Sequence, residues 1–180
     1  MQSAAWWTAK PREDLSQGDI LEHIPIVLAP MPLQYVKPQQ FKGGITGWVK
    51  SDVPFKDKGG RVTLFSAGFV SLAIIISHDC DLDDQGSSKS VLVARVELID
   101  AAPPEHRPVI ISQENLPRMF LPEVPAIGNC FANLRSIATV ERAAVNGAKR
   151  IASMSDDARI QMQARLVAVF TRRCMPPPKG

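Results

Sequence analysis

The sequence contains few cysteines, and those it has are not spaced like a disulfide framework. Cys80, Cys130 and Cys174 are odd in number and far apart in the chain. Small proteins that rely on disulfides carry paired cysteines and belong to oxidising compartments. We therefore expect free thiols or metal ligands in a reducing compartment.

Long apolar runs are also missing. No stretch approaches the roughly 18 apolar residues that a membrane-spanning helix needs. The N-terminus lacks the basic region followed by an apolar region that is typical of a secretory signal. These absences predict a soluble, cytoplasmic protein with no membrane partner.

The chain has little excess of charge. A formal net charge of +3 is too small to indicate nucleic-acid binding without a localised basic patch. Six basic residues do gather toward the C-terminus, and the solvated face of a helix explains them. They are Lys149, Arg150, Arg159, Arg165, Arg172 and Arg173.

What the chain does contain is enough apolar sequence for one core. Its 180 residues are 45% hydrophobic, which suits one ordinary globular domain and is short for two. We expect an N-terminal arm over 1–17, a single domain over 18–174 and a proline-rich tail over 175–180. Trp6 and Trp7 in the arm are expected to pack on the domain.

Short apolar runs bounded by turn residues predict a mainly β domain. Pro25 makes the first run an edge or bulged strand. The third and fourth runs are expected to pair as a hairpin. The runs lie at 20–28, 61–65, 69–77, 91–99, 119–121 and 128–137.

Proline and glycine interrupt every apolar run between 29 and 60, which predicts a long loop with a short strand at 45–49. A helix is predicted near the C-terminus, where Ser155 can cap it and two aspartates favour its first turn. Its apolar face is predicted from helical spacing, with Met162, Leu166 and Val169 beside it. That face comprises Ile160, Ala164, Val167 and Phe170.

The order of these pieces resembles that of the MazF/PemK toxin family. Its members run from a Gly-Asp opening strand to an apolar strand ending in Ser, then to an Arg-Ser/Thr-Ile/Val segment and a C-terminal helix. The matching segments here are 18–20, 73–77, 134–140 and 155–170. The resemblance implies a small SH3-like β-barrel with a long first loop and a C-terminal helix, in a bacterial, toxin-antitoxin-like protein that is plausibly a dimer.

The residues of that family's ribonuclease site are not matched. An Arg-Arg or Arg-Pro pair before the Ser-ended strand is replaced by 69–72, and the Ser or Thr of the next strand is absent from 93–98. Arg61 or Arg95 could supply a relocated cation for an RNA phosphate. The resemblance thus implies a divergent member that binds nucleic acid or a protein partner, and whether it is an enzyme stays open.

The segment 77–84 replaces the family pattern with an imidazole, a thiol and four carboxylates. On an extended chain, His78 and Cys80 would point to one side, and Asp79 and Asp81 to the other. His78 and Cys80 could then bind zinc or iron, with Cys130 or His106 as a further ligand. If these residues do not bind a metal ion, no cofactor is expected.

Three other interpretations of the chain stay open. The cluster could be the catalytic centre of a hydrolase, either a ribonuclease or a metal- or thiol-dependent enzyme, with Cys80 as nucleophile, His78 or His106 as base and Asp79 or Asp81 as orienter. Its residues could instead be structural, with a buried thiol and turn-forming aspartates. Finally, the tryptophan arm and the proline-rich loops could belong to a structural subunit of a larger complex.

Overall fold

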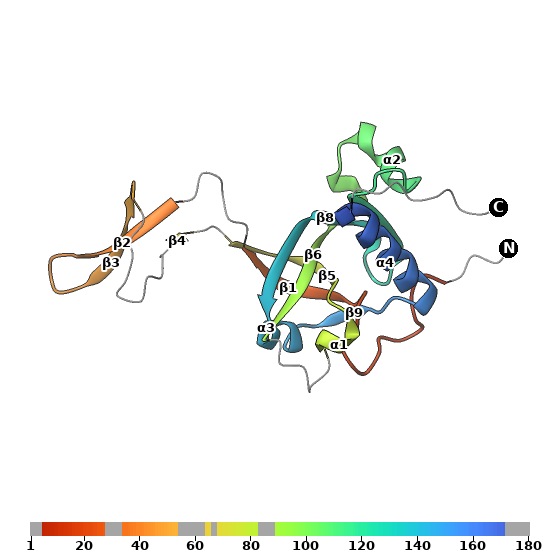
Figure 1. The fold of residues 1–180 in the computed structure, drawn as a ribbon, viewed down its shortest axis with the longest axis horizontal. Helices are drawn as coiled ribbons and strands as arrows, with labels where there is room; N and C mark the ends of the chain where they lie inside the picture. Colours follow the sequence, from red (N-terminus) through yellow and green to blue (C-terminus); the bar gives the residue numbers. More distant parts are fainter. Residues whose placement is uncertain (1–4, 28–33, 54–63, 66–67, 83–88, 172–180) are drawn as a thin grey trace. The chain divides into compact units, whose positions relative to one another are not determined.

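The computed structural model describes residues 5–27, 34–53, 64–65, 68–82 and 89–171 (Figure 1). The chain divides into two compact units, one formed by 1–26 with 70–180 and the other by 27–69. No helix in the described ranges is long and apolar enough to cross a membrane. The predicted boundaries at 17/18 and 174/175 stay predictions.

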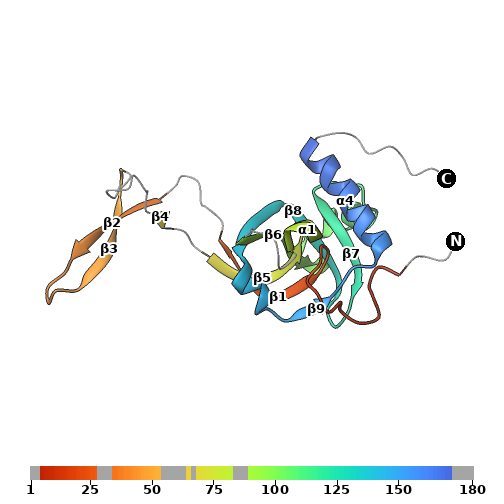
Figure 2. The same cartoon turned by 60° about the horizontal axis from the view of Figure 1, so that its bottom comes forward.

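The first unit is built on a six-stranded sheet in the order β7-β8-β6-β5-β1-β9, and Figure 2 shows it curving around its core. The predicted hairpin of β5 and β6 is confirmed, since Leu72 pairs with Val96 and Ile75 with Val93. The strands are β1 (Ile20–Val27), β5 (Gly68–Ile75), β6 (Ser90–Leu98), β7 (Arg118–Val124), β8 (Gly128–Glu141) and β9 (Arg150–Ala152).

The sheet is open in the part of the chain that the structure describes. Strands β7 and β9 lie at its two edges and are not paired with each other there. The expectation of a mainly β fold with a C-terminal helix is therefore confirmed, whereas the expected closed barrel is not found among the described residues.

Helices connect and cover the strands. The connection between β6 and β7 contains two 3-10 turns and a short helix. The elements are α1 (Asp79–Leu82), η1 (Ile99–Ala101), η2 (Pro104–His106), α2 (Arg107–Ile111), α3 (Arg142–Asn146) and α4 (Asp156–Thr171).

The core lies between the sheet and α4. Alternate residues of the strands point into it, as the two-residue period of a strand requires; examples are Ala94 and Val96 of β6, both nearly inaccessible to solvent. The arm closes one side, with Trp7 Nε1 donating a hydrogen bond to the carbonyl oxygen of Pro122 at 2.7 Å. Trp6 and Trp7 pack against the core cluster, which confirms the prediction made for them.

Strand β1 lies between β5 and β9, so the prediction of an edge strand is wrong for its first residues. Its pairing with β9 is limited to Ile20 and Leu21, and Pro25 lies beyond these pairs. The register of β1 against β9 shifts between Ile20 and Leu21, and His23 has a positive φ, so the strand is irregular before Pro25. A bulge at Pro25 itself stays a prediction.

Helix α4 buries a different face from the one predicted. Ala158 and Met162 are buried in the core, whereas Ile160, Val167 and Phe170 are 63%, 59% and 65% exposed. The helical spacing of apolar residues did not identify the buried face, because α4 has apolar residues on both of its sides. The predicted cap is confirmed, since the Ser155 hydroxyl accepts a hydrogen bond from the backbone N–H of Ala158 at 3.3 Å.

The second unit contains a three-stranded sheet in the order β3-β2-β4. Its strands are β2 (Gln34–Gln40), β3 (Thr46–Ser51) and β4 (Leu64–Phe65). Strands β2 and β3 form a hairpin inside the loop predicted for 29–60. The short strand expected at 45–49 corresponds to β3. The remaining parts of that loop, 29–33 and 54–60, lie outside the described residues.

Candidate functional site

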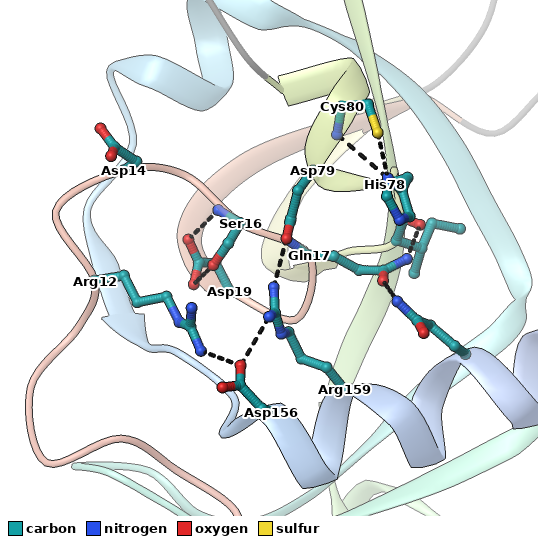
Figure 3. Close-up of polar contacts among 12 residues, drawn as sticks. Arg12, Asp14, Ser16, Gln17, Asp19, His78, Asp79, Cys80, Asp156 and Arg159 are labelled. Atoms are coloured by element: carbon teal, nitrogen blue, oxygen red, sulfur yellow. Dashed lines mark hydrogen bonds and ion pairs between the residues drawn. The ribbon is translucent and has the colours of Figure 1, made fainter.

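The acidic segment after β5 turns sharply. Ser77 fixes the end of the strand, because its hydroxyl accepts a hydrogen bond from the N–H of Leu92 at 2.8 Å and its own N–H donates to the Leu92 carbonyl. Helix α1 then begins at Asp79 (Figure 3). The condition of an extended chain, on which the one-sided arrangement of His78 and Cys80 depended, is therefore not met, because the segment is already helical at Cys80.

The turn brings His78 and Cys80 together. His78 Nδ1 lies 2.9 Å from Cys80 Sγ, and the backbone N–H of Cys80 donates to the same nitrogen at 3.3 Å. Because His78 Nδ1 accepts a hydrogen bond from the Cys80 N–H, this nitrogen carries a lone pair and no proton. The Cys80 thiol is therefore the donor in its contact with Nδ1. Both residues are exposed. A thiol beside a proton acceptor is the arrangement that activates a cysteine nucleophile.

The carboxylate of Asp79 is engaged by hydrogen bonds and anchors α1. Its carboxylate accepts hydrogen bonds from the Arg159 guanidinium at 2.5 Å and from the backbone N–H of Gln17 at 2.7 Å. Arg159 also donates to Asp156 at 2.8 Å, and Arg12 donates to the same carboxylate at 2.6 Å. These two hydrogen bonds lower the pKa of Asp156. Figure 3 shows this chain of alternating charges, which links the arm, α1 and α4.

A second, buried ion pair holds the arm against β9. Asp19 is inaccessible to solvent and lies 3.2 Å from the Nε atom of Arg150. Burial raises the pKa of Asp19, while hydrogen bonds from Ser153 and Ser16 and the charge of Arg150 act in the opposite direction. Arg150 also donates hydrogen bonds to backbone carbonyls of the arm, among them that of Asp14 at 2.8 Å.

For three of the six C-terminal basic residues, these contacts correct the interpretation as a solvated helix face. Arg150 and Arg159 are partly buried in ion pairs. Arg165 is buried and donates to the Gln113 side chain at 2.6 Å and to the Asn115 carbonyl at 2.6 Å. No motif in the sequence signals these pairings, because each joins residues far apart in the chain.

Cys80 opens onto a cavity of about 930 Å³ in the first unit. The arm, α1, α3 and β9 all contribute side chains to its wall, and these carry charges of both signs. Its size is within the range of sites that hold small molecules. The lining residues are Arg12, Glu13, Asp14, Leu15, Ser16, Asp79, Cys80, Leu82, Arg142, Asn146 and Arg150.

The structure does not bring the third proposed metal ligand to this pair. Cys130 is buried in the core, where burial raises the pKa of its thiol to about 11. Within the described ranges, no three His, Cys, Asp or Glu side chains are grouped to hold a metal ion. Two ligands, His78 and Cys80, are in place, and a bound zinc or iron ion stays a prediction for elemental analysis.

The other predicted site residues lie apart from the His78–Cys80 contact or outside the described chain. Asp81 is exposed, and its N–H donates to the His78 carbonyl at 2.9 Å. His106 belongs to η2 and lies 3.3 Å from an Arg118 nitrogen. Arg95 forms an ion pair with Glu97 at 3.5 Å. Arg61 and Cys174 lie outside the described residues.

Comparison with known proteins does not add an assignment, since no protein-family model matches the chain and no curated protein matches it significantly.

Proposed function

We propose that the chain is a thiol-dependent hydrolase in which Cys80 is the nucleophile and His78 the general base. The observation that carries the proposal is the 2.9 Å contact between His78 Nδ1 and the Sγ atom of Cys80, a residue that lines the polar cavity. Of the functions considered for segment 77–84, a cysteine nucleophile needs the fewest groups in addition to His78 and Cys80, which are already in contact. A metal centre requires further ligands.

The chemistry follows from the two side chains. His78 takes the thiol proton, and the sulfur attacks the carbonyl carbon of an ester or amide to form a tetrahedral intermediate. When the bond to the leaving group breaks, His78 returns the proton to that group and a thioester remains on Cys80. Water then attacks the thioester, gives a proton to His78 and releases the acid, and the thiolate regains that proton.

Asp79 is a positioning residue in this proposal. Its carboxylate is held by Arg159 and by the Gln17 N–H, so it is not free to receive a proton from substrate. The same contacts hold the first residue of α1, which lies between His78 and Cys80 in the chain. The lining by both arginine and carboxylate side chains favours a polar substrate that carries charges.

The proposal is tested with p-nitrophenyl acetate, an activated ester. The intact protein should give a burst of p-nitrophenol, and mass spectrometry should find the acetyl group on Cys80. Cys80→Ser should abolish the burst, and His78→Ala should slow acylation by a factor on the order of 10² to 10⁴.

Cys174→Ser is the matched control, because it removes another thiol and should leave the burst intact. Cys130→Ala is a second control, since that thiol is buried. A burst that persists in Cys80→Ser, or an acetyl group found on another residue, contradicts the proposal.

A second candidate function is the nucleic-acid- or partner-binding role that the MazF/PemK resemblance implies. The order of elements in the first unit favours it: a Gly-Asp opening before β1, the Ser77-ended run of β5, Arg135 and Ser136 in β8, and the C-terminal helix α4. RNA binding and cleavage assays on the intact protein, Arg61→Ala and Arg95→Ala test it. Intact RNA binding in both variants would remove the two cations proposed for it.

A further inference from the structure

A second cavity of the first unit lies where η2, the segment before β7 and the strands β7 and β8 meet. Its volume is about 350 Å³, and it shares no described lining residue with the cavity beside Cys80. Apart from a proline, every described side chain in its wall can donate a hydrogen bond, and none carries a carboxylate. The lining residues are His106, Asn115, Pro117, Arg118, Asn133 and Arg135.

The pairing of the strands places the two arginines of this wall. Arg118 lies opposite Asn133 in the register of β7 against β8. Its neighbour Met119 points into the core, so Arg118 belongs to the other face of the sheet. The register of β8 against β6 skips 134–136, and irregularities of this kind redirect side chains beside functional sites. Arg135 lies in that stretch and reaches the cavity wall.

The described residues do not neutralise these two arginines. Neither Arg118 nor Arg135 forms an ion pair with a described residue. The guanidinium carbon of Arg118 lies 5.8 Å from the centroid of the buried Phe131 ring, and one of its nitrogens lies 3.3 Å from His106 Nδ1. Because a guanidinium can only donate, His106 Nδ1 accepts, and the neutral imidazole carries its proton on Nε2. The cavity wall therefore holds two uncompensated positive charges.

The two asparagines present their amino groups as additional donors. The Oδ1 atom of Asn115 accepts a hydrogen bond from the backbone N–H of Arg118 at 3.3 Å. In the same way, Asn133 Oδ1 accepts one from the N–H of Arg135 at 3.2 Å. Neither Nδ2 group has a hydrogen-bond partner among the described residues. Arg165, buried in α4, holds the first asparagine in place by donating to its carbonyl at 2.6 Å. The fold thus positions the donors in advance of any ligand.

We propose that this cavity binds a dianionic phosphate group, as a small phosphomonoester or as the free ion. A phosphomonoester carries a charge of about −1.5 to −2 near pH 7 and three acceptor oxygens. These match two guanidinium groups and the amino groups beside them. Arginine suits phosphate because its fork of N–H groups can bind two oxygens at once. The volume is at the lower end of the range for small-molecule sites, so the ligand is small.

The surroundings of the cavity do not favour a nucleic-acid strand. Glu105 and Glu114 are exposed and directly precede two of the lining residues. Arg95 of β6, the strand next to β8, is ion-paired with Glu97 at 3.5 Å. A groove that follows a nucleic-acid backbone carries positive charge along its length. A long polyanion would meet negative charge around this site, whereas a single phosphate group would not.

Binding is measured by isothermal titration calorimetry on the full chain, near pH 7 and at low salt. The probes are phenyl phosphate, inorganic phosphate, phenyl sulfate and a single-stranded RNA oligonucleotide without terminal phosphates. Phenyl phosphate should bind about tenfold or more tightly than phenyl sulfate, which has a similar shape but less negative charge. Phenyl phosphate that binds at least as tightly as inorganic phosphate assigns the site to a phosphomonoester, and the reverse order assigns it to the free ion.

The sharpest variant is Asn133→Asp. Its carboxylate can still accept the hydrogen bond from the Arg135 N–H, but a negative charge replaces the Nδ2 donor group. Binding of both phosphate probes should weaken by about tenfold or more, while the melting temperature stays close to that of the wild type. Asn129→Asp is the matched control, because Asn129 accepts the same kind of hydrogen bond, from the Glu123 N–H at 3.0 Å, and does not line the cavity.

Two arginine changes complete the test. Arg135→Gln should weaken phosphate binding by about tenfold or more, and Arg118→Lys should weaken it because lysine keeps the charge but loses the two-pronged donor. Lys149→Gln removes one positive charge outside the cavity and should leave binding unchanged. Absence of binding to both phosphate probes, binding that survives Asn133→Asp and Arg135→Gln, or an RNA oligonucleotide that binds as tightly as phenyl phosphate overturns the proposal.

Discussion

At the scale of single residues, the candidate site depends on carboxylates that are held rather than free. Asp79 and Asp19 each lie in an ion pair with an arginine, Arg159 and Arg150 respectively. The sequence gives no sign that each aspartate lies close to its arginine, because the two members of each pair are far apart in the chain. Asp79, which was expected to form a turn or orient a base, instead attaches α1 to the arm and α4, and Asp19 attaches the start of β1 to β9.

Asp19 leads to a prediction about pH. Because burial raises its pKa above the usual 3.8, the folded protein holds a proton there more strongly than the unfolded chain. The protonated carboxyl therefore contributes stability below pH 3.8, and this contribution is lost as the pH rises through the pKa of the folded state. The melting temperature of the wild type relative to Asp19→Asn should fall as the pH is raised from below 3.8.

The control for this experiment is Asp100→Asn, at an exposed residue whose ion pair with Arg107 lies on the surface. Its melting temperature relative to the wild type should not show the same fall. A difference between wild type and Asp19→Asn that is constant with pH, or that grows as the pH rises, would contradict the assignment of burial as the dominant cause.

At the scale of elements, the entry into β1 depends on a glycine. Gly18 has a φ of +89°, and a Cβ atom there would lie 2.9 Å from the Cβ of Met154. Its N–H donates a hydrogen bond to the carbonyl of Ile75 at 2.9 Å, which connects the turn to β5. The Gly18-Asp19 pair at the start of β1 thus has a structural reason in this chain.

Gly18→Ala should lower the free energy of unfolding by more than the same change at Gly128. Gly128 has a φ of +91° but open space around it, so Gly128→Ala isolates the backbone strain of about 1–2 kcal/mol. Gly18→Ala adds the clash with Met154. Urea denaturation of both variants measures the difference, and equal losses would show that Met154 moves aside without penalty.

The prediction of secondary structure succeeded where a short segment contains its own signal. The apolar, β-branched runs became β5 and β6, and Ser155 with two aspartates marked the start of α4. It failed where the choice depends on a distant partner. The buried side of α4 is decided by the sheet beneath Met162, and the hairpin of β2 and β3 formed despite the pairing of Pro38 with Trp48.

At the scale of the whole molecule, the chain contains two units that are covalently joined at two points. The second unit is inserted between β1 and β5, which are hydrogen-bonded neighbours in the six-stranded sheet. Among the described residues of the inserted segment 28–67, none belongs to the core cluster that contains Ile20, Ala94 and Met162. The first unit should therefore fold without it.

Replacing 28–67 by a short linker of glycine and serine should leave a protein that unfolds cooperatively, with a melting temperature close to that of the full chain. The reaction of Cys80 with p-nitrophenyl acetate should also be kept, because the cavity wall belongs to the first unit. Scanning calorimetry and the burst assay measure both. Loss of cooperative unfolding would show that the second unit is required for the fold of the first.

The sequence by itself determined the local choices: a mainly β chain, the apolar runs that became strands, the cap of α4, and the gathering of His78, Asp79 and Cys80 in one short segment. These follow from propensities and hydrogen bonds within a few residues. The tertiary structure decided which side of α4 is buried, that Asp79 is bound by Arg159, and that Cys80 opens onto a cavity with Arg150 in its wall. Each of these depends on packing and charge pairing between residues distant in the chain, which no local pattern specifies.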